Sequence, residues 1–295
     1  MAKEQKTEAV RVERLERAEA TLYLLGSDPL IMNRMAAKAK QQLLLPPRAK
    51  NRAEREMVLK HEPDLEYRDS VYRCRDSGAP TYVHFPSGSF KKAMANAAVD
   101  TPGATKAQSG RLIKVIDETV YIWGKPFLYM AVVRQAGFRA APDIRTRAIF
   151  PKWATKITVQ YVRNLIREQD IVNLLDGAGM IIGIGDGRTE KGTFNYGGWQ
   201  IVAKDDKRWH DIVRTGGRVV QEAAMRNPEC YDEDTEELYS WYHAEVIRRE
   251  KNMLFTGATA TPKKKSARAQ GDGTGEVILP PSTITGKSRG KSASA

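Results

Sequence analysis

The chain has 295 residues, 41% of them hydrophobic and 28% charged, which is typical of a globular protein with a sizeable core. Its formal net charge of +12 favours polyanionic partners such as nucleic acid. From its charged N-terminus and short apolar runs we expect neither a signal peptide nor a membrane span. Two cysteines without metal-ligand spacing are expected to be reduced, as in a cytoplasmic protein.

The first half of the chain alternates between segments typical of strands and of helices. In chain order we predict a strand over Thr21–Leu25, helices over Met35–Leu45 and Arg52–Lys60, a hairpin of Val71–Cys74 with Thr81–Phe85, a helix over 88–98 capped by Ser87 or Ser89, and strands over Leu112–Trp123 and Phe127–Val133.

In the second half we predict a strand over Lys156–Val162, a helix over Glu168–Ala178, a strand over Trp199–Val202, and helices over Trp209–Met225 and Glu233–Lys251. Gly216 and Gly217 are expected to interrupt the first of these last two helices. The residues beyond 255 are rich in Gly, Ser, Thr, Pro and Lys, which is typical of a disordered tail. Residues 261–295 hold seven Lys and Arg against two acidic residues, so most of the net charge lies on the folded part.

The order of these elements indicates the fold class. Strand 21–25, helix 88–98 and strand 112–123 form one split unit, and strand 156–162, helix 168–178 and strand 199–202 form a second. Two such units predict an α+β protein with a ferredoxin-like, RRM-like βαββαβ core. We expect a charged segment at 1–19, a domain over 20–204 with insertions at 26–86 and 124–150, a helical extension over 205–254, and a basic tail over 255–295.

The segment Gly177–Gly198 holds eight glycines in 22 residues. Glycine exposes backbone N–H groups and allows close approach to phosphates, while Arg188 and Lys191 add charge and Tyr196 adds a surface for stacking. A P-loop is absent, and a dinucleotide-binding fingerprint would need a strand before the glycines and a helix after them. The predicted order here is the reverse, so we expect no nucleotide cofactor. The alternative is a flexible connection whose glycines only form turns.

Three motifs resemble one family. The pattern GxGxxRxxKGxxxxGxW over residues 183–199, the stretch HFPSGSFKKA over 84–93, and the strand-turn LGSDPLIM over 25–32 resemble the RAMP superfamily. Its members form the crRNA-binding backbone and the processing subunits of CRISPR effector complexes. The same segments are similar to uncharacterised bacteriophage proteins. Over residues 20–202 the resemblance implies a ferredoxin-like fold with the glycine-rich loop near RNA, in the cytoplasm of a bacterial host cell, encoded by a phage or mobile element.

The candidate binding residues fall into three groups. The start of the predicted helix 88–98 could bind anions through its backbone N–H groups and its lysines. The alternative is an ordinary capped helix that faces solvent. The insertion 124–150 is expected to be a basic loop that includes Phe138. The glycine-rich loop supplies backbone and charge. The candidates are Ser87, Ser89, Lys91 and Lys92; Arg134, Arg139, Arg145 and Arg147; and Gly185, Gly187, Arg188, Lys191 and Tyr196.

These features predict a protein that binds single-stranded RNA or DNA through the backbone, as a single copy or as a multimer along the strand. One alternative is a metal-independent endoribonuclease, for which His84 is the catalytic candidate. The other is a structural protein that its basic tail tethers to nucleic acid. Asp186 and Glu190 are two carboxylates in a glycine loop and are expected to be solvated, so no metal is predicted.

Overall fold

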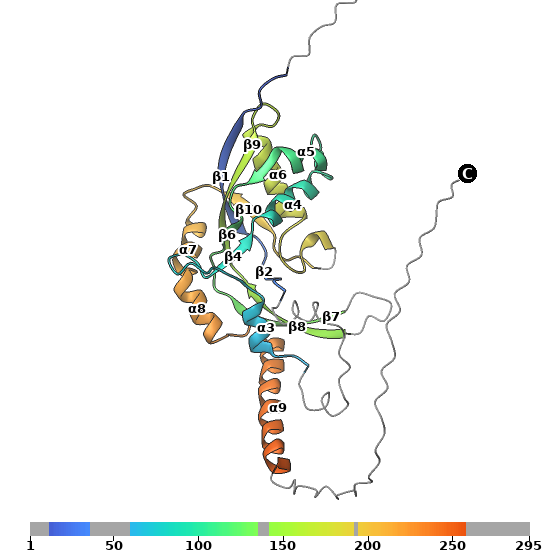
Figure 1. Ribbon diagram of the computed structural model, residues 1–295, viewed down its shortest axis with the longest axis vertical. Coiled ribbons are helices and arrows are strands. Elements are labelled where there is room, and N and C mark those ends of the chain that lie inside the picture. The colour runs from blue at the N-terminus through green and yellow to red at the C-terminus, as the bar shows by residue number, and fades with distance from the viewer. Residues whose placement is uncertain (1–11, 36–59, 135–141, 192–193, 258–295) are drawn as a thin grey trace, which may run out of the picture. The chain divides into compact units, whose positions relative to one another are not determined.

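The structure is a computed structural model that describes residues 12–35, 60–134, 142–191 and 194–257 (Figure 1). The helices predicted over Met35–Leu45 and Arg52–Lys60 fall outside these ranges except for single end residues, and so does nearly all of the basic tail. The chain divides into two compact units, Met1–Ile247 and Arg248–Ala295. All the elements described below lie in the first unit, except the end of the last helix.

The main sheet has four strands: β1 (Arg17–Gly26), β5 (Ile113–Val115), β9 (Ala154–Val162) and β10 (Trp199–Val202). Their order in space is β10-β1-β9-β5, and all neighbours are antiparallel. Helix α4 (Gly88–Ala97) precedes β5 in the chain, and α6 (Glu168–Ile181) connects β9 to β10. The strands of the two split units therefore interleave in one antiparallel sheet. The predicted α+β class is confirmed.

The alternation of side chains along β1 decides what covers each face of this sheet. Ala20, Leu22 and Leu24 are buried in one core with apolar residues of α4 and α6. Tyr23 points to the opposite face, where its ring meets that of Trp209 edge-on at 5.0 Å. Trp209 belongs to α7 (Lys207–Thr215), and Figure 1 shows α4 and α6 on one side of the strands and α7 on the other.

Two smaller sheets carry the insertions. One has the order β2-β8-β7, with β2 (Leu30–Ile31), β7 (Phe127–Arg134) and β8 (Pro142–Phe150). The other has the order β3-β4-β6, with β3 (Tyr72–Arg73), β4 (Val83–Pro86) and β6 (Thr119–Tyr121). Tyr72 pairs with His84 and Arg73 with Val83, which confirms the predicted hairpin.

Two predictions for this part of the chain were wrong. The segment 112–123 is not one strand: α5 (Lys106–Leu112) ends where β5 begins, and β6 belongs to a different sheet. The break falls at Asp117 and Glu118, where the chain bends and the Glu118 carbonyl accepts a hydrogen bond from the Ser87 amide at 3.0 Å. The segment expected to be a basic loop contains β8, which pairs with β7 over its full length. The alternation is weak in the first part of β8, because Asp143, Arg145, Thr146 and Arg147 leave Ile144 as the only apolar residue between Pro142 and Ala148.

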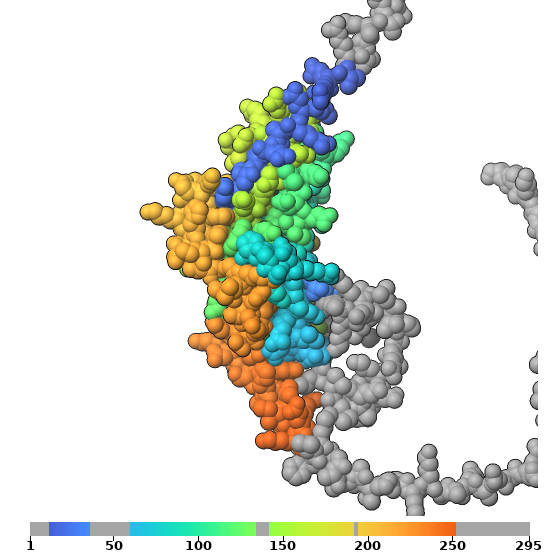
Figure 2. All heavy atoms as spheres, turned by 60° about the vertical axis from the view of Figure 1, so that its left-hand side comes forward, coloured from blue at the N-terminus to red at the C-terminus, as the bar shows by residue number. Residues whose placement is uncertain are grey.

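The remaining helices are α3 (Pro63–Asp69), α7, α8 (Arg218–Arg226), α9 (Glu233–Gly257) and the short 3₁₀ helix η1 (Thr189–Lys191). The predicted interruption at Gly216 and Gly217 separates α7 from α8. On the face seen in Figure 2, α8 (orange) lies beside residues 60–90 (cyan). The fully buried Gln221 joins them, because its Oε1 accepts from the Tyr82 and Val83 amides, both at 2.9 Å.

Within the ranges described above, no helix is long and apolar enough to cross a membrane. The same residues contain no group of three or more His, Cys, Asp or Glu side chains that could hold a metal ion.

Candidate nucleic-acid interface

The glycine-rich loop, residues 182–198, joins the end of α6 to the start of β10. It is held by backbone hydrogen bonds to the turn between β1 and β2 and to β2 itself: the Asp186 amide donates to the Ile31 carbonyl at 3.0 Å, and the Gly197 amide donates to the Pro29 carbonyl at 2.8 Å. Gly185 has φ +84°, and a Cβ there would lie 2.4 Å from the Ile31 carbonyl oxygen. The described part of the loop is therefore a shaped element, and its glycines permit the close contact with β2.

One hollow lies between this loop and α4, with a volume of about 200 Å³. Ser89 and Lys92 line it from α4, and Gly185 and Arg188 line it from the loop, as the sequence predicted for one surface. Asn96, one turn beyond Lys92 on α4, also lines it and was not predicted. We call this the α4 hollow.

Arg188 in the α4 hollow is compensated by a carboxylate. Its Nε and Nη2 lie 2.8 and 2.7 Å from Glu190 Oε2, and Asn96 Nδ2 donates to the other oxygen of Glu190. Partial burial opposes ionisation of Glu190, but the hydrogen bonds and charge of Arg188 prevail, so the pKa of Glu190 falls below its ordinary value. Lys92 is exposed and forms no ion pair with the described residues. It is the hollow's uncompensated cation.

A second hollow, also of about 200 Å³, lies between the loop and the β7–β8 hairpin. Three aromatic rings line it: Tyr129 from β7, and Phe194 and Tyr196 from the loop. Phe194 and Tyr196 stack with centroids 5.9 Å apart, and Tyr129 meets Tyr196 edge-on at 6.5 Å. Burial, together with a hydrogen bond to Tyr196, raises the pKa of Tyr129, which keeps its phenol protonated. We call this the aromatic hollow.

Three cations share the aromatic hollow, and the arginines differ in their surroundings. Arg145 is exposed and has no ion pair within the described ranges, whereas Arg147 is mostly covered. The Nε of Arg147 lies 3.0 Å from Asp186 Oδ2, an ion pair without hydrogen-bond geometry, and its Nη1 donates to the Met32 carbonyl at 3.2 Å. Burial lowers the pKa of Arg147, and Asp186 opposes this shift. Lys191 completes the set.

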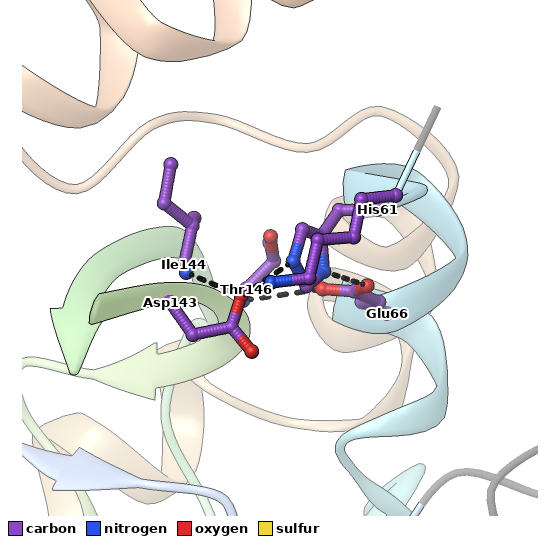
Figure 3. Close-up of polar contacts among 6 residues, drawn as sticks. His61, Glu66, Asp143, Ile144 and Thr146 are labelled. Carbon is purple, nitrogen blue, oxygen red and sulfur yellow. Dashed lines mark hydrogen bonds and ion pairs between the residues drawn. The ribbon is translucent and has the colours of Figure 1, made fainter. Parts of the chain in front are cut away.

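The hairpin that carries the aromatic hollow is tied to the start of α3 by a histidine between two carboxylates (Figure 3). His61 Nδ1 lies 2.8 Å from Glu66 Oε1, and its Nε2 lies 2.9 Å from Asp143 Oδ1. Lys60 also pairs with Asp143, and the Thr146 amide donates to Glu66. Both nitrogens of His61 are engaged, so this cluster fixes the position of β8 and offers no open base.

Most of the predicted binding residues line one of the two hollows. Ser89, Lys92, Gly185 and Arg188 line the α4 hollow, and Arg145, Arg147, Gly187, Lys191 and Tyr196 line the aromatic hollow. The sequence missed Tyr129, although it shares one face of a recognisable strand with Ala131 and Val133, which also line the aromatic hollow. Nothing in the sequence marks Asn96 as a binding residue, because an asparagine within a helix is common.

The other predicted residues lie elsewhere. Ser87 occupies the N-cap position of α4, one of the two predicted positions, but it is buried and its side chain forms no cap hydrogen bond. Lys91 lines a different hollow, at the edge of the main sheet. Arg134 ends β7, but its side chain, like the whole of Arg139, lies outside what the structure describes. His84 is half-buried on β4 and lines neither hollow, and burial lowers its pKa.

No family model matches the chain, and no curated protein matches it. Among solved structures, a chain of the Type III-B Cmr-beta bound to cognate target RNA aligns with a TM-score of 0.37 and 11% sequence identity. The alignment covers 63% of this chain and 59% of that chain, so it spans well under two thirds of the neighbour. A TM-score this low does not establish a common fold.

Proposed function

We propose that this protein binds single-stranded nucleic acid, contacting the sugar-phosphate backbone on both sides of the glycine-rich loop and stacking bases in the aromatic hollow. The aromatic hollow is the observation that carries the proposal. It combines three aromatic rings with three cationic side chains around one largely apolar depression. Aromatic faces stack on any base, and adjacent cations neutralise phosphates, so the combination suits a single strand with little sequence preference.

The α4 hollow supplies the complementary polar contacts. Lys92 is uncompensated, and Ser89 of the same helix also lines the hollow. Both hollows share the loop as a common wall, because Gly185 and Arg188 line one and Gly187 and Lys191 line the other. A strand that crosses the loop could place a phosphate against Lys92 and a base against Phe194.

The carboxylates in these hollows shape the expected affinity. Glu190 and Asp186 hold Arg188 and Arg147 in fixed positions, but they also compete with phosphate for these guanidinium groups. We therefore assign the larger share of phosphate attraction to Lys92 and Arg145, and a positioning role to the paired arginines.

The motifs shared with the RAMP superfamily support RNA as the partner. As part of the proposal, the protein is a RAMP-like module encoded by a phage or mobile element. Several copies of it bind side by side along one strand. Mass photometry on strands of increasing length tests the last point, since a multimer adds copies in proportion to length. A single bound copy at every length would contradict it.

Fluorescence anisotropy with labelled 30-nucleotide RNA and DNA tests the binding itself. Phe194 is 49% exposed, so Phe194→Ala should leave the fold intact. Loss of one stacked base, about 1–3 kcal/mol, predicts binding about 5- to 150-fold weaker. Tyr121→Ala is the matched control, because Tyr121 is an exposed aromatic on β6 that lines neither hollow. Wild-type protein that binds neither strand, or equal affinity of wild type and Phe194→Ala, would overturn the proposal.

A further inference from the structure

A third hollow, of about 230 Å³, lies at the edge of the main sheet formed by β5. Cations from four places in the chain line it: Arg17 from β1, Lys91 from α4, Arg111 from α5 and Lys114 from β5. Arg17, Arg111 and Lys114 are exposed and Lys91 is half-buried. Only Lys91 was expected from the sequence to belong to a binding surface. We call this the edge hollow.

The charge of the edge hollow is not compensated. The side chains that line it, all within the described residues, include no carboxylate. None of its four cations forms an ion pair with the described part of the chain, although Arg111 Nε donates to the Ala107 carbonyl at 3.1 Å. This contrasts with Arg188 and Arg147, which are both paired with acids.

Three nearby acidic residues bond to partners other than the four cations, and two of these partners, Gln160 and Tyr161, line the edge hollow themselves. Glu19 accepts a hydrogen bond from Gln160 Nε2 at 3.0 Å, and Glu168 accepts one from the Tyr161 hydroxyl at 3.4 Å. Glu16, close to Arg17 in the sequence, pairs with Arg163. Four cations gathered without a counter-charge repel one another, and a bound polyanion removes that repulsion.

Helix α4 contributes neighbouring residues to the edge hollow and to the proposed strand-binding surface. Lys91 and Lys92 are neighbours on α4, yet Lys91 lines the edge hollow and Lys92 lines the α4 hollow. Lysine on an edge strand also prevents sheets from pairing. That role accounts for Lys114 but not for the cations that converge on it from β1, α4 and α5.

We propose that the edge hollow binds phosphate groups of the same nucleic-acid strand, so that the bound strand passes around α4 from the glycine-rich loop to the β5 edge. This inference rests on the proposed function and extends its footprint. The ligand class is the phosphodiester backbone, without base recognition, because no aromatic ring other than that of Tyr161 lines the hollow, and Tyr161 is buried.

The test compares three double variants of the full chain by the salt dependence of 30-nucleotide strand binding. Arg111→Gln with Lys114→Gln removes two cations from the edge hollow. Lys204→Gln with Lys207→Gln removes the same charge beside and on α7, and neither of these exposed lysines lines any of the three hollows. Arg111→Lys with Lys114→Arg keeps the charge and controls for altered shape.

Each phosphate contact to a single strand contributes about 0.7 to the slope of log K against log salt, so losing two lowers the slope by about 1.4 and weakens binding about 25-fold at 0.1 M salt. The α7 variant and the charge-conserving variant are expected to keep the wild-type slope. Equal slopes for the edge and α7 variants would overturn this inference alone. Absence of strand binding by the wild type would overturn the proposed function and this inference together.

Discussion

Helix α6 contains two glycines, Gly177 and Gly179. Replacing one or the other by alanine is expected to change the stability of the protein in opposite directions. A Cβ at Gly177 would meet only Thr101 Oγ1, at 4.0 Å, which is an ordinary contact. A Cβ at Gly179 would lie 2.1 Å from the Trp199 carbonyl oxygen and 2.8 Å from Trp199 Cδ1. Trp199 cannot easily move away, because its Nε1 donates to the Leu175 carbonyl of the same helix at 3.1 Å.

The expected magnitudes follow from these contacts. Alanine is more favourable than glycine in a helix interior by about 0.5–1 kcal/mol, so Gly177→Ala stabilises the protein by that amount. Gly179→Ala also forces α6 away from β10, and overpacking of this kind costs about 1–3 kcal/mol. The two variants therefore differ by about 1–3 kcal/mol or more, which corresponds to roughly 2–12 °C in the melting temperature of a domain of this size.

Thermal unfolding of both variants beside the wild type measures the difference, and anisotropy with labelled RNA adds a functional readout. Because α6 leads directly into the glycine-rich loop, Gly179→Ala is also expected to weaken strand binding, whereas Gly177→Ala leaves it unchanged. If both variants melted at the same temperature, the close approach of α6 to β10 would be refuted. If Gly179→Ala melted lower but bound equally well, the loop position would not matter for binding.

Two further predictions concern charge. Glu190→Gln removes the counter-charge of Arg188, so strand binding is expected to tighten and its salt slope to steepen by about 0.7; unchanged binding would show that Arg188 meets no phosphate. Asp206 caps α7. Hydrogen bonds from Arg208 lower the pKa of Asp206 from 3.8 to about 2, although burial has a smaller opposing effect. A lowered pKa stabilises the folded state above pH 3.8, and this contribution is lost as the pH falls through about 2. The melting temperatures of wild type and Asp206→Asn should therefore differ near neutral pH and converge below pH 4, and a constant difference would contradict the assignment.

Local pattern was enough to predict part of this protein. Alternating and helical spacing of apolar residues predicted β1, β9, α6 and β10, and the glycine pair predicted the break between α7 and α8, because these signals act over a few residues. The same patterns failed at β8, where Arg145, Thr146 and Arg147 leave few apolar positions, and at 112–123, where a bend assigns neighbouring residues to different sheets.

The character of the candidate site depended on tertiary contacts. The sequence grouped Lys91 with Lys92 and named Arg188 as a charged candidate of the glycine-rich loop. In the folded protein Lys91 and Lys92 line different hollows, and Glu190 forms an ion pair with Arg188. It also brings Tyr129 from a distant strand to Phe194 and Tyr196. The sequence thus determined which residue types are present on each element, while the packing of distant elements decided which charges are compensated and which rings share a hollow.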